Sequence, residues 1–189
     1  MLTFFCFLLA LILFFSKSLL RHPIARSDIE EFVGDSQFQW VIADPAHKTG
    51  EIKSNDEIDR VILCTGQVYA ALAKHRADNK IDNVAITRIE QLHPFPWEQL
   101  KENLDSYPNA KTIVWAQEEP LNAGAWSYTQ PRIETLLNNT QHHDRKHVMY
   151  AGRNPSASVA TGLKASHYKE EQDLLEKAFE VVQDKLKGE

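Results

Sequence analysis

The chain has 189 residues, of which 43% are hydrophobic, and a formal net charge of −5 at pH 7. This length suits one domain with extensions, and the apolar content excludes a chain that is disordered throughout. The acidic balance, with both signs of charge mixed along the chain, excludes general nucleic-acid binding, which requires a basic face.

The first fifteen residues form an uncharged apolar run that is followed by Ser16 and Lys17. The run is shorter than the roughly 18–20 residues that span a bilayer, no basic residue precedes it, and no small-residue cleavage site follows it. A signal-peptide core, a short membrane anchor, and a buried strand at residues 11–15 behind an unrelated cap at residues 1–10 all fit the pattern. We favour the strand with its cap and do not expect a membrane span.

Residues 16–58 read as a connector between this apolar segment and the main domain. Ser27 is a candidate helix N-cap, and Glu30 three residues later completes a capping box. The patterns predict, in chain order, a helix at residues 27–32, a strand at 38–43 and a charged loop at 44–59.

Residues 59–189 alternate between short apolar runs and amphipathic segments, without repeats or low-complexity tracts. The apolar runs predict strands at residues 60–65, 84–89, 112–116 and 147–150, and the amphipathic segments predict helices at 67–78, 97–104, 125–137 and 164–186. Pro131 inside the third of these helices predicts a kink or a later start. The alternation indicates an α/β fold, a three-layer α/β/α sandwich around a mostly parallel sheet.

Polar side chains gather directly after two of the predicted strands: Glu90, Gln91 and His93 after one, and Gln117, Glu118 and Glu119 after the other. Open parallel sheets build their sites at the carboxyl ends of the strands. We therefore expect the functional site at this edge of the sheet.

Glu118 and Glu119 are the most prominent pair of acids in this region. Adjacent residues of an extended strand point to opposite faces, so the two cannot act together as an acid/base pair unless the chain has already turned. We expect one carboxylate to face a helix N-terminus or an arginine and the other to face solvent. The alternative is that both are interface candidates, used in contact with another protein surface.

Arg88 and Arg153 follow apolar strands, and Arg153 opens a loop of small and hydroxylated residues at 152–162. Backbone amides of such a loop, together with a guanidinium, can hold a phosphate. No glycine-rich nucleotide motif supports this site. Structural ion pairs with Glu90 or Glu118 are therefore the favoured interpretation.

Three histidines and an aspartate gather near one predicted loop: His142, His143, Asp144 and His147. Zinc motifs require two separated ligand pairs held by a fold, so we assign no metal site. Cys6 and Cys64 lie far apart, which argues against a disulfide framework, and Cys64 belongs to an apolar strand with no base beside it in sequence. The sequence therefore gives no candidate for a catalytic nucleophile, and we assign no catalytic residue.

Several motifs resemble the C-terminal domain of the 2-oxoglutarate dehydrogenase family, in the family's order and spacing. They are SKSLLRHP at residues 16–23, LCTG at 63–66, RIEQL at 88–92, PFP at 94–96, YPNA at 107–110, QEEP at 117–120, GAW at 124–126 and YAGR at 150–153. The resemblance implies a mixed five-stranded sheet of the transketolase C-terminal type. It also implies an oxidoreductase of the tricarboxylic acid cycle, of which this chain is a fragment that we expect to be inactive alone.

The resemblance carries further expectations for the intact enzyme. Thiamine diphosphate and magnesium are expected in domains other than this one, with no cofactor-binding residue in this chain. The expected partners are a second subunit in a homodimer and the dihydrolipoyl succinyltransferase core, in the mitochondrial matrix. Bacterial relatives bind nucleotide or acetyl-CoA, which makes Arg21, Arg88 and Arg153 candidates for an allosteric anion or acyl-CoA site. The alternative function is a free-standing regulatory module that binds such a ligand.

Overall fold

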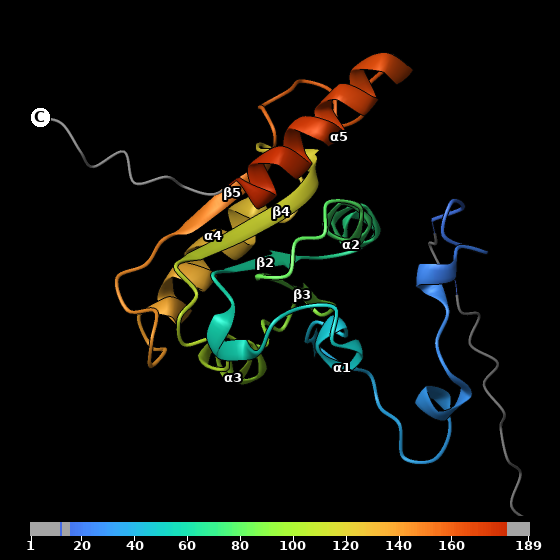
Figure 1. The fold of residues 1–189 in the computed structure, drawn as a ribbon. Coiled ribbons are helices and arrows are strands. Elements are labelled where there is room, and N and C mark those ends of the chain that lie inside the picture. Colours follow the sequence, from blue (N-terminus) through green and yellow to red (C-terminus); the bar gives the residue numbers. More distant parts are fainter. Residues whose placement is uncertain (1–11, 13–15, 181–189) are drawn as a thin grey trace, which may run out of the picture. The chain divides into compact units, whose positions relative to one another are not determined.

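The computed structural model describes residue 12 and residues 16–180, and the chain divides after Ser36 into two units (Figure 1). The strand expected at residues 11–15 and its cap at 1–10 lie outside the described residues, except for Ile12, which has no regular structure. None of the helices in the described ranges is both long and apolar enough to cross a bilayer.

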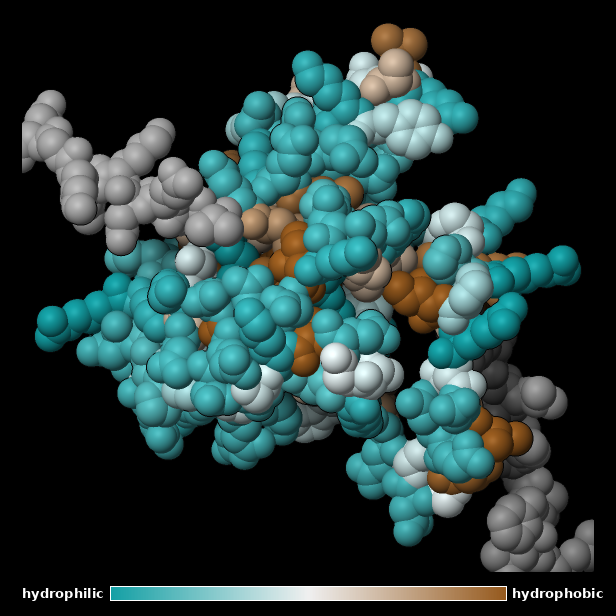
Figure 2. Space-filling model, in the orientation of Figure 1, coloured by the Kyte–Doolittle hydropathy of each residue, from teal (hydrophilic) through white to brown (hydrophobic). Residues whose placement is uncertain are grey.

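The first unit contains two 3-10 helices, η1 (Pro23–Ala25) and η2 (Ile29–Phe32). The predicted capping box is wrong, because Asp28 precedes η2 and no side chain caps it. Figure 2 shows hydrophobic side chains at the surface of this unit, which Figure 1 draws in blue, and Ile29 and Phe32 are 71% and 72% exposed.

The second unit is built on a five-stranded sheet with the order β1-β3-β2-β4-β5. The strands are β1 (Val41–Ile42), β2 (Arg60–Cys64), β3 (Val84–Ile89), β4 (Thr112–Pro120) and β5 (Val148–Arg153). β1 pairs with β3 in the antiparallel sense, and the three other pairings are parallel. The prediction of a mostly parallel sheet is therefore confirmed.

Helices cover both faces of the sheet, which completes the predicted three-layer sandwich (Figure 1). They are α1 (Ala46–Thr49), α2 (Val68–Asp78), α3 (Trp97–Asp105), α4 (Trp126–Leu137) and α5 (Lys164–Phe179), with a 3-10 turn η3 (Asn55–Glu57). α2 and α5 pack on one face, and α3 and α4 lie on the other. α4 runs through Pro131, an exposed residue inside the helix, so the later start predicted from Pro131 is wrong.

Several predicted strand and helix bounds are wrong. For the strands the reason is the same: a strand ends where its pairing partner ends, which local sequence preference does not show. The strand expected at residues 38–43 is reduced to β1, and the expected loop at 44–59 contains α1 and η3. β4 continues four residues beyond its predicted end, to Pro120, because β5 still pairs with it there. β5 likewise continues to Arg153. α5 ends at Phe179, before its predicted end at residue 186, because Glu180 has left the helical conformation, and residues 181–186 lie outside the described residues.

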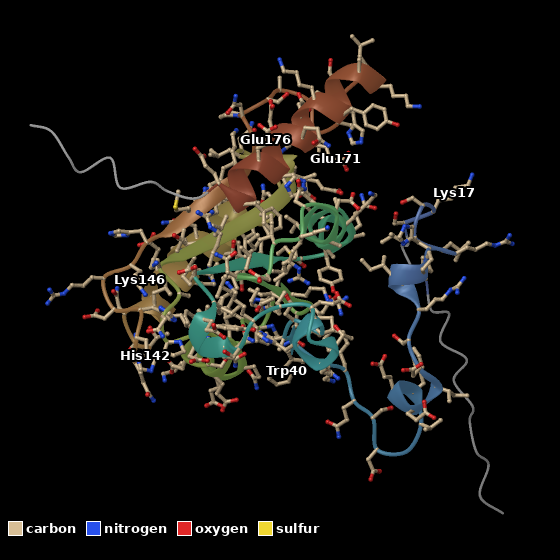
Figure 3. All side chains as sticks on the ribbon, in the orientation of Figure 1. Lys17, Trp40, His142, Lys146, Glu171 and Glu176 are labelled. Atoms are coloured by element: carbon tan, nitrogen blue, oxygen red, sulfur yellow. The ribbon has the colours of Figure 1, made fainter. Side chains whose placement is uncertain are left out.

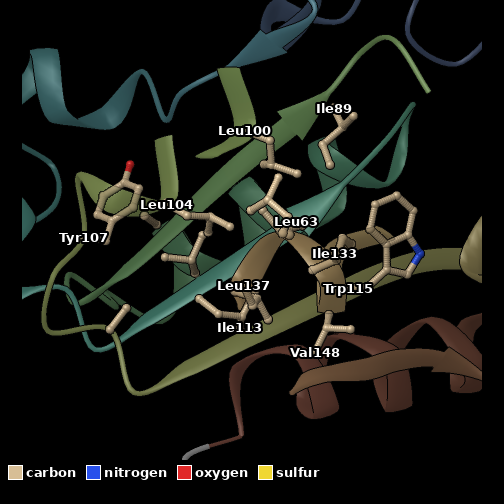
Figure 4. Close-up of a cluster of buried hydrophobic side chains, with 14 of the residues drawn as sticks. Leu63, Ile89, Leu100, Leu104, Tyr107, Ile113, Trp115, Ile133, Leu137 and Val148 are labelled. Carbon is tan, nitrogen blue, oxygen red and sulfur yellow. The ribbon is translucent and has the colours of Figure 1, made fainter. Parts of the chain in front are cut away.

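Two apolar clusters fill the two sides of the sheet. The side under α3 and α4 buries Trp115, Tyr107 and Leu104 together with aliphatic residues of β2, β3 and β4 (Figure 4). The side under α2 and α5 buries smaller residues, among them Cys64, Ala116 and Ala151. Small side chains on this second side let the helices approach the sheet closely, as close-packed interiors require.

A buried ion pair seals the outer edge of β3 where β1 stops. Asp44 accepts a hydrogen bond from the Ile86 amide at 2.6 Å and forms a two-pronged pair with Arg76 of α2. Arg76 in turn donates to the Val84 carbonyl at 3.1 Å, and the Ala46 amide donates to Asp44 at 3.0 Å. The pair therefore supplies the hydrogen-bond donor and acceptor that a longer β1 would otherwise offer to the outer edge of β3.

Residues 37–58 belong to the second unit, although the sequence suggested a connector for them. Trp40, labelled in Figure 3, extends the β1 pairing, because its carbonyl accepts the amides of Glu90 at 2.9 Å and Gln91 at 3.2 Å. Ala46 and Ile52 are buried in the core cluster under α3 and α4. The division of the chain into an apolar segment, a connector and a domain beginning at residue 59 remains a proposal.

Removing the carboxylate of the edge-sealing pair is expected to destabilise the second unit strongly. Asp44→Ala leaves Arg76 buried without its counter-ion and should lower the free energy of unfolding by about 3–5 kcal/mol. The matched control is Asp78→Ala, which removes an exposed pair with Lys74 and should cost less than about 1 kcal/mol. Urea denaturation of the three proteins checks this, and equal losses for both variants would contradict it.

Candidate functional site

A cavity of about 400 Å³ opens at the carboxyl edge of the three central strands. The chain passes from β2 outward to β3 and then returns to β4 on the other side of β2, so the strand order reverses between β2 and β4. This is the point at which open α/β sheets bind ligands. The lining residues are Thr65, Leu92, His93, Gln117, Glu119, Gly124, Ala125 and Tyr128.

The amide of Gln117 organises the floor of this cavity. Its oxygen accepts the Trp115 indole N–H and the Trp126 backbone amide, both at 2.9 Å. Its nitrogen donates to the carbonyls of Ala123 at 2.9 Å and Pro120 at 3.2 Å. Because these bonds use both its donors and its acceptor, Gln117 holds the turn between β4 and α4 and has no group left for a ligand.

Gly124 is required in that turn. Its φ is +64°, and a Cβ atom at this position would lie 3.0 Å from the Gln117 amide nitrogen and 3.0 Å from the Glu119 Cβ. Both the left-handed backbone and the close approach exclude larger residues. The chain therefore passes near the Gln117 and Glu119 side chains at the cavity wall.

The opposite wall carries the polar pair His93 and Tyr128. The imidazole Nδ1 lies 3.0 Å from the Tyr128 hydroxyl, and the rings meet edge to face. The Arg132 guanidinium stacks 3.6 Å from the Tyr128 ring centre and donates to the Tyr128 carbonyl, which orients the ring. The sequence indicated His93 as a site residue but not Tyr128 or Thr65. Thr65 could have been found, because it lies at the carboxyl end of a buried strand, whereas no sequence pattern marked Tyr128.

Glu118 and Glu119 point to opposite faces of the sheet. Glu118 accepts a 2.7 Å hydrogen bond from Gln67, the residue before α2, whereas Glu119 lines the cavity and is exposed. Burial raises the pKa of the Glu118 carboxyl, and the bond from Gln67 offsets part of this effect. The two acids have no common partner, so the geometry provides no acid/base pair.

Arg88 is the last but one residue of β3, and Arg153 is the last residue of β5. Both lie on the side of α2 and α5, but three strand spacings, roughly 14 Å, separate them. Arg88 stacks 4.5 Å from the Tyr69 ring centre and lies 3.6 Å from a Glu90 carboxylate oxygen. Arg21 belongs to the first unit. The three arginines are therefore not brought to one site within the second unit.

Arg153 has internal partners of its own. Its Nε lies 2.6 Å from a Glu170 carboxylate oxygen, although the N–H direction there is poor for a hydrogen bond, and its Nη1 donates to the Val159 carbonyl at 2.7 Å. A shallow cavity of about 200 Å³ beside it is also lined by Lys177 and Asp173. Positive and negative side chains balance there, which reduces the attraction for a free phosphate.

The histidine loop is a structural tie to α3. His143 is buried, with Nε2 2.9 Å from the Leu104 carbonyl and Nδ1 2.8 Å from the Lys146 ammonium. The carbonyl can only accept, so Nε2 carries the proton and Nδ1 accepts from Lys146. His147 instead pairs with Glu134 at 2.9 Å. Across the described residues, no group of three or more His, Cys, Asp or Glu side chains could hold a metal ion.

Comparison with known proteins connects this chain to one family. Residues 26–179 match the family described as 2-oxoglutarate dehydrogenase C-terminal. The chain is 52% identical over 170 residues to the mitochondrial 2-oxoglutarate dehydrogenase of Schizosaccharomyces pombe, which covers 89% of this chain and 16% of that protein. It is 49% identical over 170 residues to the Saccharomyces cerevisiae protein of the same name, covering 90% and 17%.

The chain thus spans 16–17% of the length of these relatives. A solved structure titled "Split gene transketolase, inactive beta4 tetramer" aligns with a TM-score of 0.48 and 16% identity, covering 76% of this chain and 43% of that one.

Replacing Arg153 is expected to weaken the fold in the absence of any ligand. Arg153→Ala removes the partner of Glu170 and the bond to Val159, and should lower the free energy of unfolding by about 1–3 kcal/mol. Arg145→Ala, which removes an exposed pair with Asp144, is the control and should cost less than about 1 kcal/mol. Melting curves with and without acetyl-CoA check this. A ligand-dependent shift that disappears in an otherwise stable Arg153→Ala would support the anion site instead.

Stability should depend on pH through His143. Burial lowers the pKa of this imidazole in the folded chain, although the bond to Leu104 opposes the shift. The unfolded chain therefore takes up a proton first, and stability is lost as the pH falls from about 6.5 towards the folded pKa, by at most roughly 1.4 kcal/mol per pH unit. His143→Gln should remove this slope in urea denaturation, whereas His142→Gln, at an exposed position, should retain it.

Proposed function

Because this chain belongs to the 2-oxoglutarate dehydrogenase C-terminal family, we propose that it is the C-terminal α/β domain of a 2-oxoglutarate dehydrogenase. The observation that carries the proposal is the family match over residues 26–179, which includes every strand and helix of the second unit. On this proposal the domain buttresses the catalytic part of the enzyme and contributes to its homodimer. The relatives' names support a mitochondrial location for the intact enzyme.

The proposed reaction of the intact enzyme is the oxidative decarboxylation of 2-oxoglutarate, with transfer of the succinyl group to a lipoyl arm of the dihydrolipoyl succinyltransferase core. Thiamine diphosphate with magnesium supplies the decarboxylation chemistry when bound. The described residues do not fit this group, because they bring no cluster of metal-ligating side chains together. We therefore assign the cofactor to the part of the enzyme outside this chain and derive no catalytic step here.

What the second unit offers instead is a rigid support with a polar edge. The Asp44–Arg76 pair seals β3, and the Gln117 amide holds the turn into α4. The Gln117 amide keeps the carboxyl edge of the sheet in one geometry, whereas the Asp44–Arg76 pair fixes the amino-terminal half of β3. The described residues bring no nucleophile with a base beside it to the carboxyl edge. A surface of this kind suits contact with neighbouring domains, and Glu118 and Glu119 remain the interface candidates.

A free-standing module that binds nucleotide or acyl-CoA is the second candidate. The cavity beside Arg153 and Lys177 favours it. The paired state of Arg153 with Glu170, and of Arg88 with Glu90, weighs against it.

The 189-residue chain alone is expected to show no 2-oxoglutarate turnover with thiamine diphosphate, magnesium and ferricyanide as electron acceptor. A chimera tests the supporting role: the Schizosaccharomyces pombe relative with its matching 170 residues replaced by those of this chain should retain turnover. The same relative truncated before that region should lose activity or its dimeric state. Turnover by this chain alone, or an active dimeric truncation, would overturn the proposal.

A further inference from the structure

Glu119 is a carboxylate without a counter-ion at the mouth of a largely apolar cavity. Between described residues, no ion pair includes Glu119, whereas Glu90 pairs with Arg88 and Glu118 is bonded to Gln67. The side chain is exposed, so water now solvates it. Of the polar groups at the strand ends, it is therefore the one most available to a partner.

The position of this carboxylate is fixed by its surroundings. The Glu119 carbonyl accepts a bond from the Tyr150 hydroxyl at 3.2 Å, and Pro120 follows it in a buried position. The side chain passes close to Gly124, where a Cβ would lie 3.0 Å from the Glu119 Oε2. A residue other than glycine there would push the carboxylate away. The turn thus holds an acid at the cavity wall.

The rest of the cavity suits a planar cation on an apolar stem. Leu92, Ala125 and Tyr128 supply apolar and aromatic wall, and none of the eight lining residues is a lysine or arginine. The wall also presents His93, whose Nδ1 is engaged by the Tyr128 hydroxyl. One face of the Tyr128 ring already carries the Arg132 guanidinium, so the preference for arginine comes from Glu119. A guanidinium pairs with a carboxylate through two parallel bonds, whereas an ammonium is more strongly hydrated and lacks this geometry.

We propose that this cavity is the docking pocket for an arginine side chain from the part of the enzyme outside this chain. The inference rests on the proposed function, which sets this domain against the catalytic domains, and it assigns the contact to Glu119. Charge complementarity supports the choice of occupant, because this chain carries a net charge of −5 and offers an unpaired acid here.

The test uses the full chain and N-acetyl-arginine amide as the probe, followed by backbone NMR shifts. The expected result is a saturable change at the amides of Gly124, Ala125 and Tyr128. N-acetyl-citrulline amide, which has the same shape without the charge, should bind about tenfold more weakly, as expected for the loss of one charge-assisted hydrogen bond. Glu119→Gln should weaken the arginine probe by a similar factor.

Glu118→Gln is the matched control, because the neighbouring acid points to the other face of the sheet and is bonded to Gln67. It should leave binding of the probe unchanged. The proposal would be overturned if the arginine and citrulline probes bound equally well, or if the arginine probe bound Glu119→Gln as tightly as it binds the unaltered chain. So would shifts at the same amides that appear on raising the protein concentration alone, because a second copy would then be the occupant. Failure here is separable from failure of the proposed function, which the turnover of the chimera decides.

Discussion

The second unit depends on one buried ion pair at the edge of its sheet. β1 pairs with only the last two residues of β3, so the amide of Ile86 and the carbonyl of Val84 face outward without a strand beside them. Asp44 and Arg76 supply the missing partners and neutralise each other in the interior. The pair also ties α2 to the segment before α1. An open edge at this position would otherwise invite pairing with another chain.

The opposite end of the strands shows how a site can be built without reactive groups. Gln117 is buried beside Trp115, and its side-chain amide forms hydrogen bonds with the turn between β4 and α4. Gly124 permits that turn to lie against the strand. The result is a preformed cavity at the point where the strand order reverses. Its lining includes an acid, Glu119, that has no ion pair among the described residues. The proposed role of this edge is therefore recognition of a cationic group on another surface.

Charge balance weighs against an anion site at either of the two candidate arginines of the second unit. Arg88 rests on Tyr69 and near Glu90, and Arg153 lies against Glu170. Each guanidinium is partly buried, and its acidic neighbour offsets part of the cost of taking the charge out of water. An incoming phosphate would have to compete with these carboxylates. The Glu119 carboxylate has no such neighbour among the described residues, which is why the same edge favours a cation.

The sequence by itself determined the family, the α/β class and the central strands and helices. The spacing of apolar residues and the positions of glycine and proline are local signals that can be read without knowing the tertiary contacts. It also placed Glu118 and Glu119 on opposite faces, since that follows from strand geometry alone. Tertiary structure decided the strand ends, the burial of Asp44 and the partners of Arg153, because each depends on residues distant in the chain: Arg76 is 32 residues from Asp44. Tyr128 reaches the cavity because α4 packs against α3 and β4 and brings its hydroxyl to His93, 35 residues away in the chain, a contact that no local pattern encodes.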